Sequence, residues 1–314
     1  MTSFTPPAPA TAALRSRACA CCGALSTHSE LGLVSPFLAR RALLGPLEPV
    51  ELARCQACGH AWSLRGLTDE EASRLYSGYR GEGYLRARQA TEPWYTRAVN
   101  DAIGSEAAME GRRKVLAEML AAAVAQAGPR PQGRCLDFGG DRGQMLKHVP
   151  DADKFVHEVS GVELDPWARR LPALGPALGT FGLVLNCQVL EHVNDPLSAL
   201  RETADMACSG GWLYVEVPDE RWRTAWGRPG PTRERWLRAV SRSTRATVAL
   251  DFVSTACRVK LGWTPPLGFW AMREHINFFS PRSLELLARQ VGLEPILLQL
   301  TASGISLVAA KPGA

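Results

Sequence analysis

From Arg134 onward, short apolar runs alternate with segments whose pattern is helical. The runs that predict strands are Arg134–Phe138, Val159–Glu163, Gly182–Asn186 and Trp212–Val217, with closing strands within Pro295–Ala310. The segments that predict helices are Gln144–His148, Pro196–Ala207 and Ser283–Val291. Strands that alternate with helices are typical of a doubly wound, Rossmann-like α/β domain.

The part of the chain before Arg134 has a different pattern. Residues 68–127 are predicted to be mostly helical, because Thr68 and the acids after it form a helix-start signal and Glu106–Gln126 consists largely of good helix formers. The glycine- and proline-rich stretch 128–133 then marks a boundary. We therefore expect a disordered N-terminus (1–15), a cysteine-bearing module (16–66), a helical connector (67–132) and an α/β domain (133–314) with an insertion at 221–270.

Composition and charge narrow the class of protein. The 314 residues are 46% hydrophobic, enough for a sizeable core, and the net charge of +5 suits a phosphorylated substrate as well as a nucleic acid. The N-terminus lacks the basic start and apolar stretch of a signal peptide, and no apolar window is long enough to span a membrane. These features predict a cytoplasmic protein without stable membrane insertion.

Two cysteine pairs near the N-terminus predict a metal site. Cys19 and Cys22 form one C-x2-C pair, Cys55 and Cys58 form the other, and 32 residues separate the pairs. Each pair places two thiolates on one tight turn, and two such turns complete a tetrahedral four-thiolate zinc site without an open position. We expect a structural Zn²⁺ ion with Cys21 as a spectator, and unpaired thiols are the alternative.

The turn after the first predicted strand carries candidate cofactor-binding residues. A glycine-rich turn between strand and helix lets a ligand approach backbone N–H groups. The G-x-G-x-x-G spacing of dinucleotide-binding folds is absent, but residues 135–143, Cys-Leu-Asp-Phe-Gly-Gly-Asp-Arg-Gly, resemble motif I of class I S-adenosylmethionine-dependent methyltransferases. The resemblance assigns to the cofactor Asp137, Gly139, Gly140, Asp141 and Gly143, with Asp141 standing where the middle glycine of the motif usually lies.

Two later segments resemble further parts of the same family, in the family's order. Glu163 is expected to end the second strand and to accept hydrogen bonds from the cofactor ribose, and a surface carboxylate is the alternative. Residues 181–196 resemble the fourth strand and its turn, with Gln188 as a candidate cofactor contact. Glu191 and His192 are expected to buttress that turn. Only 17 residues follow Glu163 before this segment, which predicts a shortened second helix and third strand and leaves adenine recognition unassigned.

Residues 270–284 resemble a late segment of methyltransferases that act on sugars and natural products. In zinc-module sugar C-methyltransferases this segment holds a catalytic Glu-His pair, here Glu274 and His275, with the histidine as general base. The alternative is a His275 that only holds the turn by hydrogen bonding. The tyrosine of that pattern is replaced here by Met272, and Tyr76–Tyr84 resembles a connector that faces the active site in the same proteins.

The insertion is rich in arginine and tryptophan. Residues 221–246 hold eight arginines and one acid, together with Trp222, Trp226 and Trp236. Guanidinium groups bind phosphate well, so one interpretation is a lid over a phosphorylated substrate. The other is a solvated helix face with packing tryptophans.

These resemblances imply a methyltransferase that uses S-adenosyl-L-methionine and has an N-terminal zinc-binding module. The expected acceptor is carbon or oxygen of a small molecule, such as a (nucleotide-)sugar, a glycan precursor or a natural product. The alternatives are an RNA methyltransferase and a catalytically silent, methyltransferase-like scaffold. Nucleic acid is the less favoured partner, because the basic residues concentrate in one insertion and no base-stacking motif is present.

Overall fold

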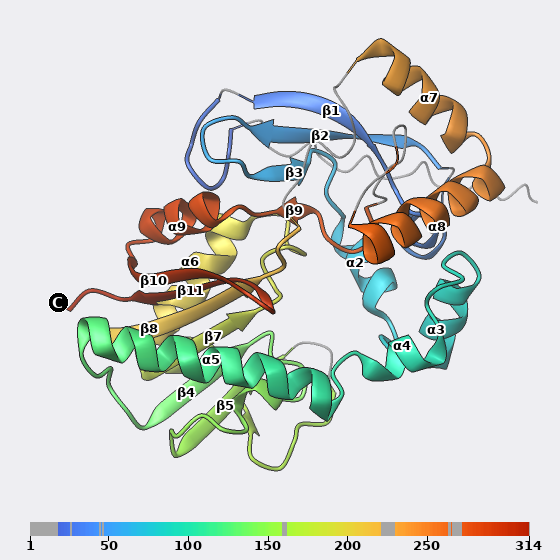
Figure 1. Ribbon diagram of the computed structural model, residues 1–314. Coiled ribbons are helices and arrows are strands. Elements are labelled where there is room, and N and C mark those ends of the chain that lie inside the picture. Colours follow the sequence, from blue (N-terminus) through green and yellow to red (C-terminus); the bar gives the residue numbers. More distant parts are fainter. Residues whose placement is uncertain are drawn as a thin grey trace, which may run out of the picture.

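The computed structural model describes residues 18–25, 27–43, 45, 47–158, 162–220, 230–262, 265 and 272–313. The N-terminus that the sequence predicts to be disordered, residues 1–15, therefore lies outside the described residues, as do Trp222, Trp226 and Trp270. Figure 1 shows a large sheet flanked by helices and a smaller sheet built mainly from the N-terminal part of the chain.

The large sheet has seven strands in the order β10-β11-β8-β7-β4-β5-β6. Its strands are β4 (Arg134–Phe138), β5 (Asp153–His157), β6 (Arg169–Arg170), β7 (Phe181–Cys187), β8 (Ala207–Val217), β10 (Glu294–Thr301) and β11 (Gly304–Ala310). Strands β4 to β8 pair in parallel, whereas β11 is antiparallel to both of its neighbours. This arrangement confirms the predicted doubly wound α/β fold.

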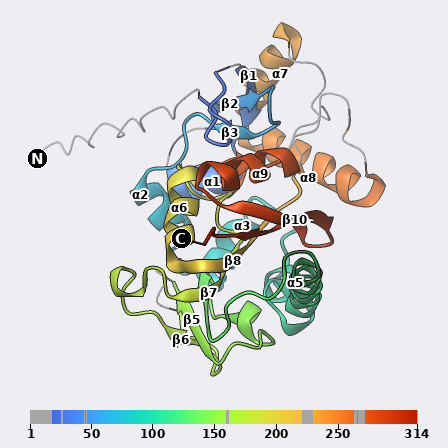
Figure 2. The same cartoon turned by 90° about the vertical axis from the view of Figure 1, so that its left-hand side faces the viewer.

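Side chains of the central strands point alternately to the two faces of this sheet, and a hydrophobic core lies on each face. Val184 packs with the residues of α6 (Pro196–Met206) and α9 (Pro281–Gln290), whereas Leu183 and Leu185 face α5 (Glu106–Ala127). Figure 2 shows α5 on one face and α6 on the other. Because successive side chains of a strand point to opposite faces, the apolar residues 183–185 of β7 contribute to both layers.

The second strand lies earlier than the sequence predicts. The strand predicted over Val159–Glu163 lies partly outside the described residues, and the strand that the structure shows beside β4 is earlier: β5 ends at His157, and its Val156 pairs with Asp137 of β4. Asp153–His157 forms a strand because it pairs with β4, although the segment contains charged residues. The predicted helix at Gln144–His148 is only a 3-10 turn, Gln144–Leu146. The shortened third strand is confirmed by the two-residue β6.

The smaller sheet combines three strands from the N-terminal part of the chain with one short strand from much later in the sequence. Its strands, in the order β1-β2-β3-β9, are β1 (Thr27–Leu33), β2 (Pro49–Cys55), β3 (Ala61–Ser63) and β9 (Asn277–Phe278), all antiparallel. An isolated bridge also links Val34 to Met272. A segment after the large insertion is thus part of the N-terminal sheet.

Short helices connect the two sheets. They are α2 (Asp69–Tyr76), α3 (Glu82–Gln89) and α4 (Arg97–Ala102), which precede α5. The helix start predicted at Thr68 is confirmed, because its side chain and that of Glu71 form a capping box. Within the described residues, no helix combines the length and the apolar character that crossing a bilayer requires.

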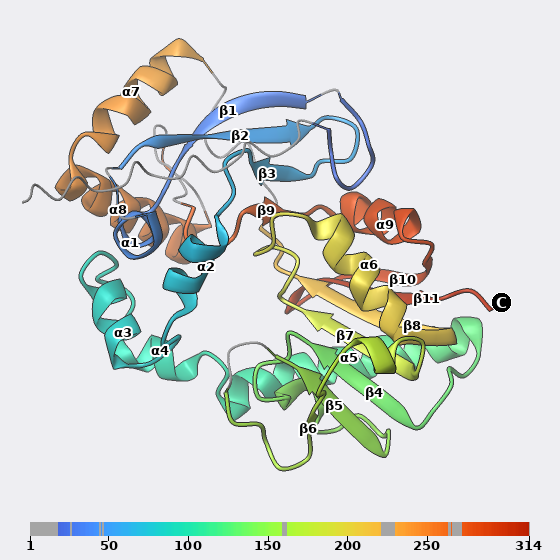
Figure 3. The ribbon, with the colours of Figure 1, turned by 180° about the vertical axis from the view of Figure 1, so that it is seen from behind.

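The described part of the insertion forms two helices, α7 (Pro231–Ser241) and α8 (Thr244–Leu261). They pack against the N-terminal sheet and against α1 (Pro36–Leu38), as Figure 3 shows from behind. Arg233 is buried beside Glu30, with 3.7 Å between Nη1 and Oε2. The remaining arginines of these two helices are exposed, namely Arg235, Arg238, Arg242 and Arg245, whereas Arg258 is half-buried.

Candidate functional site

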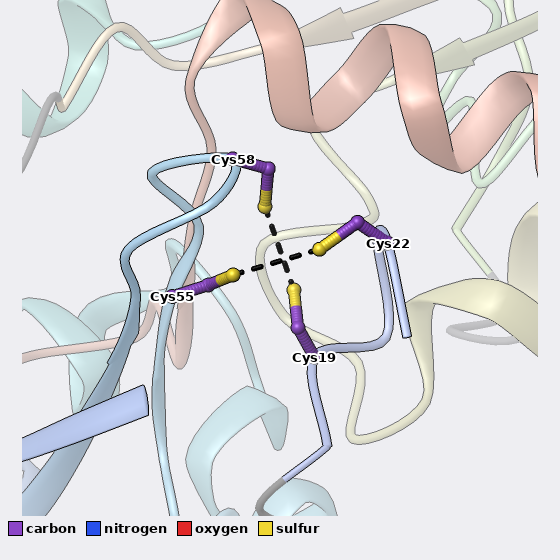
Figure 4. Close-up of side chains that lie close together, drawn as sticks. All are labelled: Cys19, Cys22, Cys55 and Cys58. Atoms are coloured by element: carbon purple, nitrogen blue, oxygen red, sulfur yellow. Dashed lines mark hydrogen bonds between the residues drawn. The ribbon is translucent and has the colours of Figure 1, made fainter. Parts of the chain in front are cut away.

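The four predicted cysteine ligands lie together at the end of the smaller sheet. The Sγ atoms of Cys19, Cys22, Cys55 and Cys58 all lie within 4.8 Å of one another (Figure 4). The distances Cys19–Cys58 and Cys22–Cys55 are both 3.5 Å. Thiolates of a tetrahedral site with Zn–S bonds of about 2.3 Å lie roughly 3.8 Å apart. The arrangement therefore fits a Zn²⁺ ion with little movement.

Both cysteine turns are shaped for a compact metal site. Gly23 and Gly59 follow the second cysteine of each pair and have φ of 71° and 80°, a region that favours glycine. The ring of His60, the residue after Gly59, is fully buried and stacks on Trp62 and Phe279 at 5.1 and 5.0 Å. His60 is thus part of the packing under the cysteine turns.

A cavity of about 1070 Å³ opens at the carboxyl ends of β4, β5 and β7. Ligands of open α/β sheets bind at this end of the strands. Its walls come from the β4 turn, the connector helices and the segment before β9. The predicted site residues that line it are Asp137, Gly139, Gly140, Asp141, Gln188, Glu274 and His275. One cavity thus joins the predicted cofactor and acceptor residues.

The glycine turn after β4 is packed too closely against neighbouring side chains to accept a Cβ atom. A Cβ atom on Gly139 would lie 2.7 Å from Val189, and one on Gly140 would lie 2.4 Å from the carboxyl carbon of Asp137. Gly143 has φ of 82° and packs as closely against Val156. Asp141, where the motif usually has a glycine, adopts φ of 50°, a conformation that aspartate tolerates better than most residues.

Asp137 is a buried carboxylate that finds no hydrogen-bond donor among the described residues. It is 1% exposed, and neither of its oxygens has a hydrogen-bond partner in this part of the chain. Burial outweighs the charge of Arg112 and raises the pKa of Asp137 from 3.8 to about 7. A buried acceptor in this state favours a ligand that brings a donor or a positive charge.

Glu158, rather than Glu163, occupies the end of the second strand in the cavity. Glu158 follows β5 directly, and its Oε2 accepts a hydrogen bond from the Asp141 N–H at 3.1 Å. Glu163 is exposed and is not among the cavity residues. The earlier strand explains the change, because β5 ends at His157, six positions before the predicted end at Glu163. An acid directly after Phe155–His157 was the available signal for Glu158.

Gln188 is held in a strained turn at the end of β7. It has φ of 60°, and its side-chain amide donates to Oε1 of Glu216 at 3.1 Å. Glu216 is fully buried and also binds Arg112 at 2.6 Å. The non-glycine residues with positive φ among the described residues are Arg80, Asp141 and Gln188, and all three line the cavity. Such strain concentrates at ligand sites.

Glu274 is fixed by a buried network from the connector. Its Oε1 accepts hydrogen bonds from Arg88, at 2.7 Å, and from the Tyr84 hydroxyl. Burial would raise the pKa of Glu274, but Arg88 and Tyr84 hold it below the ordinary value. Arg88 in turn pairs with Glu92 at 2.7 Å. Glu274 is thus an ionised group in a fixed position.

His275 pairs with a carboxylate that the sequence does not reveal. Its Nδ1 lies 2.5 Å from Oε2 of Glu220. Burial lowers the pKa of His275, but the charge and hydrogen bond of Glu220 outweigh it and raise the pKa to about 9. Its ring lies 4.8 Å from that of His192, whose pKa falls to about 4 because of burial and the charge of His275. His275 must lose its proton before it can act as a base.

The match to a protein family decides the class of this chain. The family model described as "Methyltransferase domain" matches residues 109–298, more than half of the sequence. The chain belongs to this methyltransferase family. The strand order of the large sheet agrees with this assignment.

Individual relatives of this methyltransferase share only part of its length. A ubiquinone biosynthesis O-methyltransferase of Ruegeria pomeroyi is 30% identical over 139 residues, 44% of this chain and 44% of the relative. One of Parvibaculum lavamentivorans is 36% identical over 61 residues, 19% of this chain and 24% of the relative. The chain thus spans less than half the length of these curated relatives. A solved 1,6-didemethyltoxoflavin-N1-methyltransferase of Burkholderia thailandensis has a TM-score of 0.42 and 14% identity, over 73% of this chain and 89% of that one.

Proposed function

We propose that this methyltransferase transfers a methyl group from S-adenosylmethionine to carbon or oxygen of a small molecule, such as a (nucleotide-)sugar, a glycan precursor or a natural product. The observation that carries the proposal is the single cavity that contains both the glycine turn and the Glu274–His275 segment. Methyl transfer requires the acceptor atom to lie in line with the activated methyl group, and one shared cavity supports that geometry.

The residues of the glycine turn fit the cofactor. When bound, S-adenosylmethionine supplies an activated methyl group. Asp137 would accept hydrogen bonds from its ammonium group, which gives the unpartnered carboxylate the donor that it lacks. Glu158 would accept from the ribose hydroxyls, and Gly139 and Gly140 would let the ligand approach the backbone.

The acceptor end of the cavity combines rings and charged groups. Tyr76 and Tyr79 line it from the connector, opposite Glu274 and His275. Flat aromatic faces and fixed polar groups suit a polyhydroxylated or aromatic molecule. The described arginines of the insertion do not line this cavity, so a phosphate of the substrate would need other partners.

The ribose-binding acid can be tested with a matched pair of variants. We expect Glu158→Ala to weaken S-adenosylhomocysteine binding by roughly 10- to 100-fold, because a charge-assisted hydrogen bond contributes about 1.5–3 kcal/mol. Glu163→Ala should leave the dissociation constant unchanged, since Glu163 is exposed outside the cavity. Calorimetric titration measures both. Weaker binding by Glu163→Ala together with unchanged binding by Glu158→Ala would show that Glu163 is the ribose-binding acid. If the wild type does not bind S-adenosylhomocysteine at all, the catalytically silent, methyltransferase-like scaffold is favoured.

The role of His275 can be separated from cofactor binding. We expect His275→Asn to lower methyl transfer to a nucleotide-sugar or aromatic acceptor by at least 10-fold, because general acid–base groups contribute about 10²–10⁴-fold. Its affinity for S-adenosylhomocysteine should stay within about twofold of the wild type, since the affinity depends on the β4 turn. Release of S-adenosylhomocysteine measures turnover. Full activity would remove His275 from the mechanism.

A further inference from the structure

A second buried carboxylate lies beside the acceptor end of the cavity. Glu191 is 1% exposed, and within the part of the chain that the structure describes neither of its carboxylate oxygens has a hydrogen-bond partner. Its backbone carbonyl accepts hydrogen bonds from Ile276 and Asn277, which fixes the turn after β7. A carboxylate placed so deeply without donors is costly unless a positive group or a metal ion joins it.

Two imidazole rings face this carboxylate. His192 Nε2 lies 3.8 Å from Oε1 of Glu191, and the ring of His275 packs edge-on against that of His192. One ligand atom from each of the three residues lies within 4.8 Å of the others. His192 and His275 both line the cavity, so a substrate can reach this cluster.

The other ring nitrogens are already held by partners. Nδ1 of His192 lies 2.8 Å from the Tyr76 hydroxyl and 3.2 Å from the Glu274 carbonyl oxygen. Nδ1 of His275 lies 2.5 Å from Glu220. Metal-binding histidines commonly donate one N–H to a carboxylate or carbonyl group in this way, which orients the second nitrogen toward the ion.

We propose that Glu191, His192 and His275 bind a divalent transition-metal ion through one carboxylate oxygen and two Nε2 atoms. Imidazole nitrogens favour zinc, iron, cobalt or nickel over magnesium and calcium. Metal–ligand bonds of about 2.1 Å would bring the three ligand atoms to roughly 3 Å from one another. The present cluster, with its ligand atoms within 4.8 Å, would have to contract around the ion. Three protein ligands leave positions open toward the cavity.

The ion would act on the acceptor rather than on the cofactor. A bound divalent ion polarises a hydroxyl oxygen and favours loss of its proton, so an acceptor hydroxyl at the open position would become a better nucleophile. In that form His275 is a ligand instead of the general base, and the proton of the acceptor hydroxyl passes to solvent in the cavity. The loss of activity expected for His275→Asn would then follow from loss of the ion. This inference goes beyond the proposed function, since ion binding needs neither cofactor nor acceptor.

The test is a cobalt titration of the full-length protein after its cysteine site has been saturated with Zn²⁺. We expect one Co²⁺ ion per chain by calorimetry, with the weak absorption of a nitrogen- and oxygen-ligated ion and without a thiolate-to-cobalt band. Glu191→Gln should weaken this binding at least 10-fold. Glu220→Gln should weaken it by about 10- to 100-fold, the usual effect of losing the partner of a ligating histidine.

The control is Glu234→Gln, which alters an exposed carboxylate on α7 and should bind Co²⁺ like the wild type. Retained zinc and an unchanged circular dichroism spectrum establish that each variant is folded. Absence of the second ion in the wild type, or equal binding by Glu191→Gln, would overturn the proposal. S-adenosylhomocysteine binding, measured separately, shows whether the proposed function stands in either case.

Discussion

Cys55→Ser should release the metal ion and unfold the N-terminal sheet well below the melting temperature of the wild type. Structural zinc binding contributes about 10–16 kcal/mol in small zinc-dependent domains, whereas whole proteins are stable by only about 5–15 kcal/mol. Cys55 ends β2, and its thiol lies 3.5 Å from that of Cys22. Thermal unfolding and a zinc assay measure the two effects.

Cys208→Ser is the matched control, because Cys208 is a half-buried free cysteine in β8, outside the cysteine cluster. It should keep its zinc and its melting temperature. Cys21→Ser should also keep its zinc, since we assign Cys21 a spectator role. A Cys55→Ser protein with full zinc content and unchanged stability would show that the four-thiolate assignment is wrong.

Asp137→Asn should stabilise the cofactor-free enzyme while it abolishes tight cofactor binding. Because burial raises the pKa of Asp137 from 3.8 to about 7, the folded state binds more protons than the unfolded state between these pH values. The stability of the wild type therefore falls as the pH rises through this window. Above pH 7, ionisation of the buried Asp137 lowers the free energy of unfolding of the wild type by roughly 4 kcal/mol. Asparagine does not ionise, so the variant does not lose this stability.

Denaturant unfolding at pH 4 and at pH 8 checks this result. The asparagine variant should exceed the wild type only at pH 8, and its affinity for S-adenosylmethionine should fall by more than 10-fold there. Asp153→Asn, which alters an exposed surface ion pair with Arg169, should change neither quantity appreciably. Equal stability of variant and wild type at pH 8 would mean that the carboxylate has a partner.

Much of the fold was predictable because its central strands carry local signals. The apolar run of β7 and the capped start of α2 are explicit in the sequence, and both lie where we predicted them. The second strand was missed because Asp153–His157 is held by its neighbour β4 and not by its own apolar character. Tertiary pairing of this kind outweighs intrinsic strand preference.

The same distinction between local and long-range signals applies to the candidate site. The two C-x2-C pairs and the glycine turn are short local motifs that the sequence shows directly. The structure brings the four cysteines together and places the glycine turn at the cavity. Glu158, Glu220 and the Arg88 network were not predicted, because their partners lie far away in the sequence. The described insertion helices lie outside the cavity lining, because α7 packs on β1 and β2 and α8 packs on α1 and α7.

The pairing of β9 with β3 has a consequence for protein engineering. The residues immediately before β9 line the cavity, while β9 itself completes the sheet that the cysteine turns terminate. A chimera that took only residues 18–66 from a homologue would join a foreign β3 to a native β9 and misplace the wall that carries His275. Exchange between homologues should therefore succeed only when residues 272–280 travel together with the N-terminal module, so the two segments would be inherited as one unit.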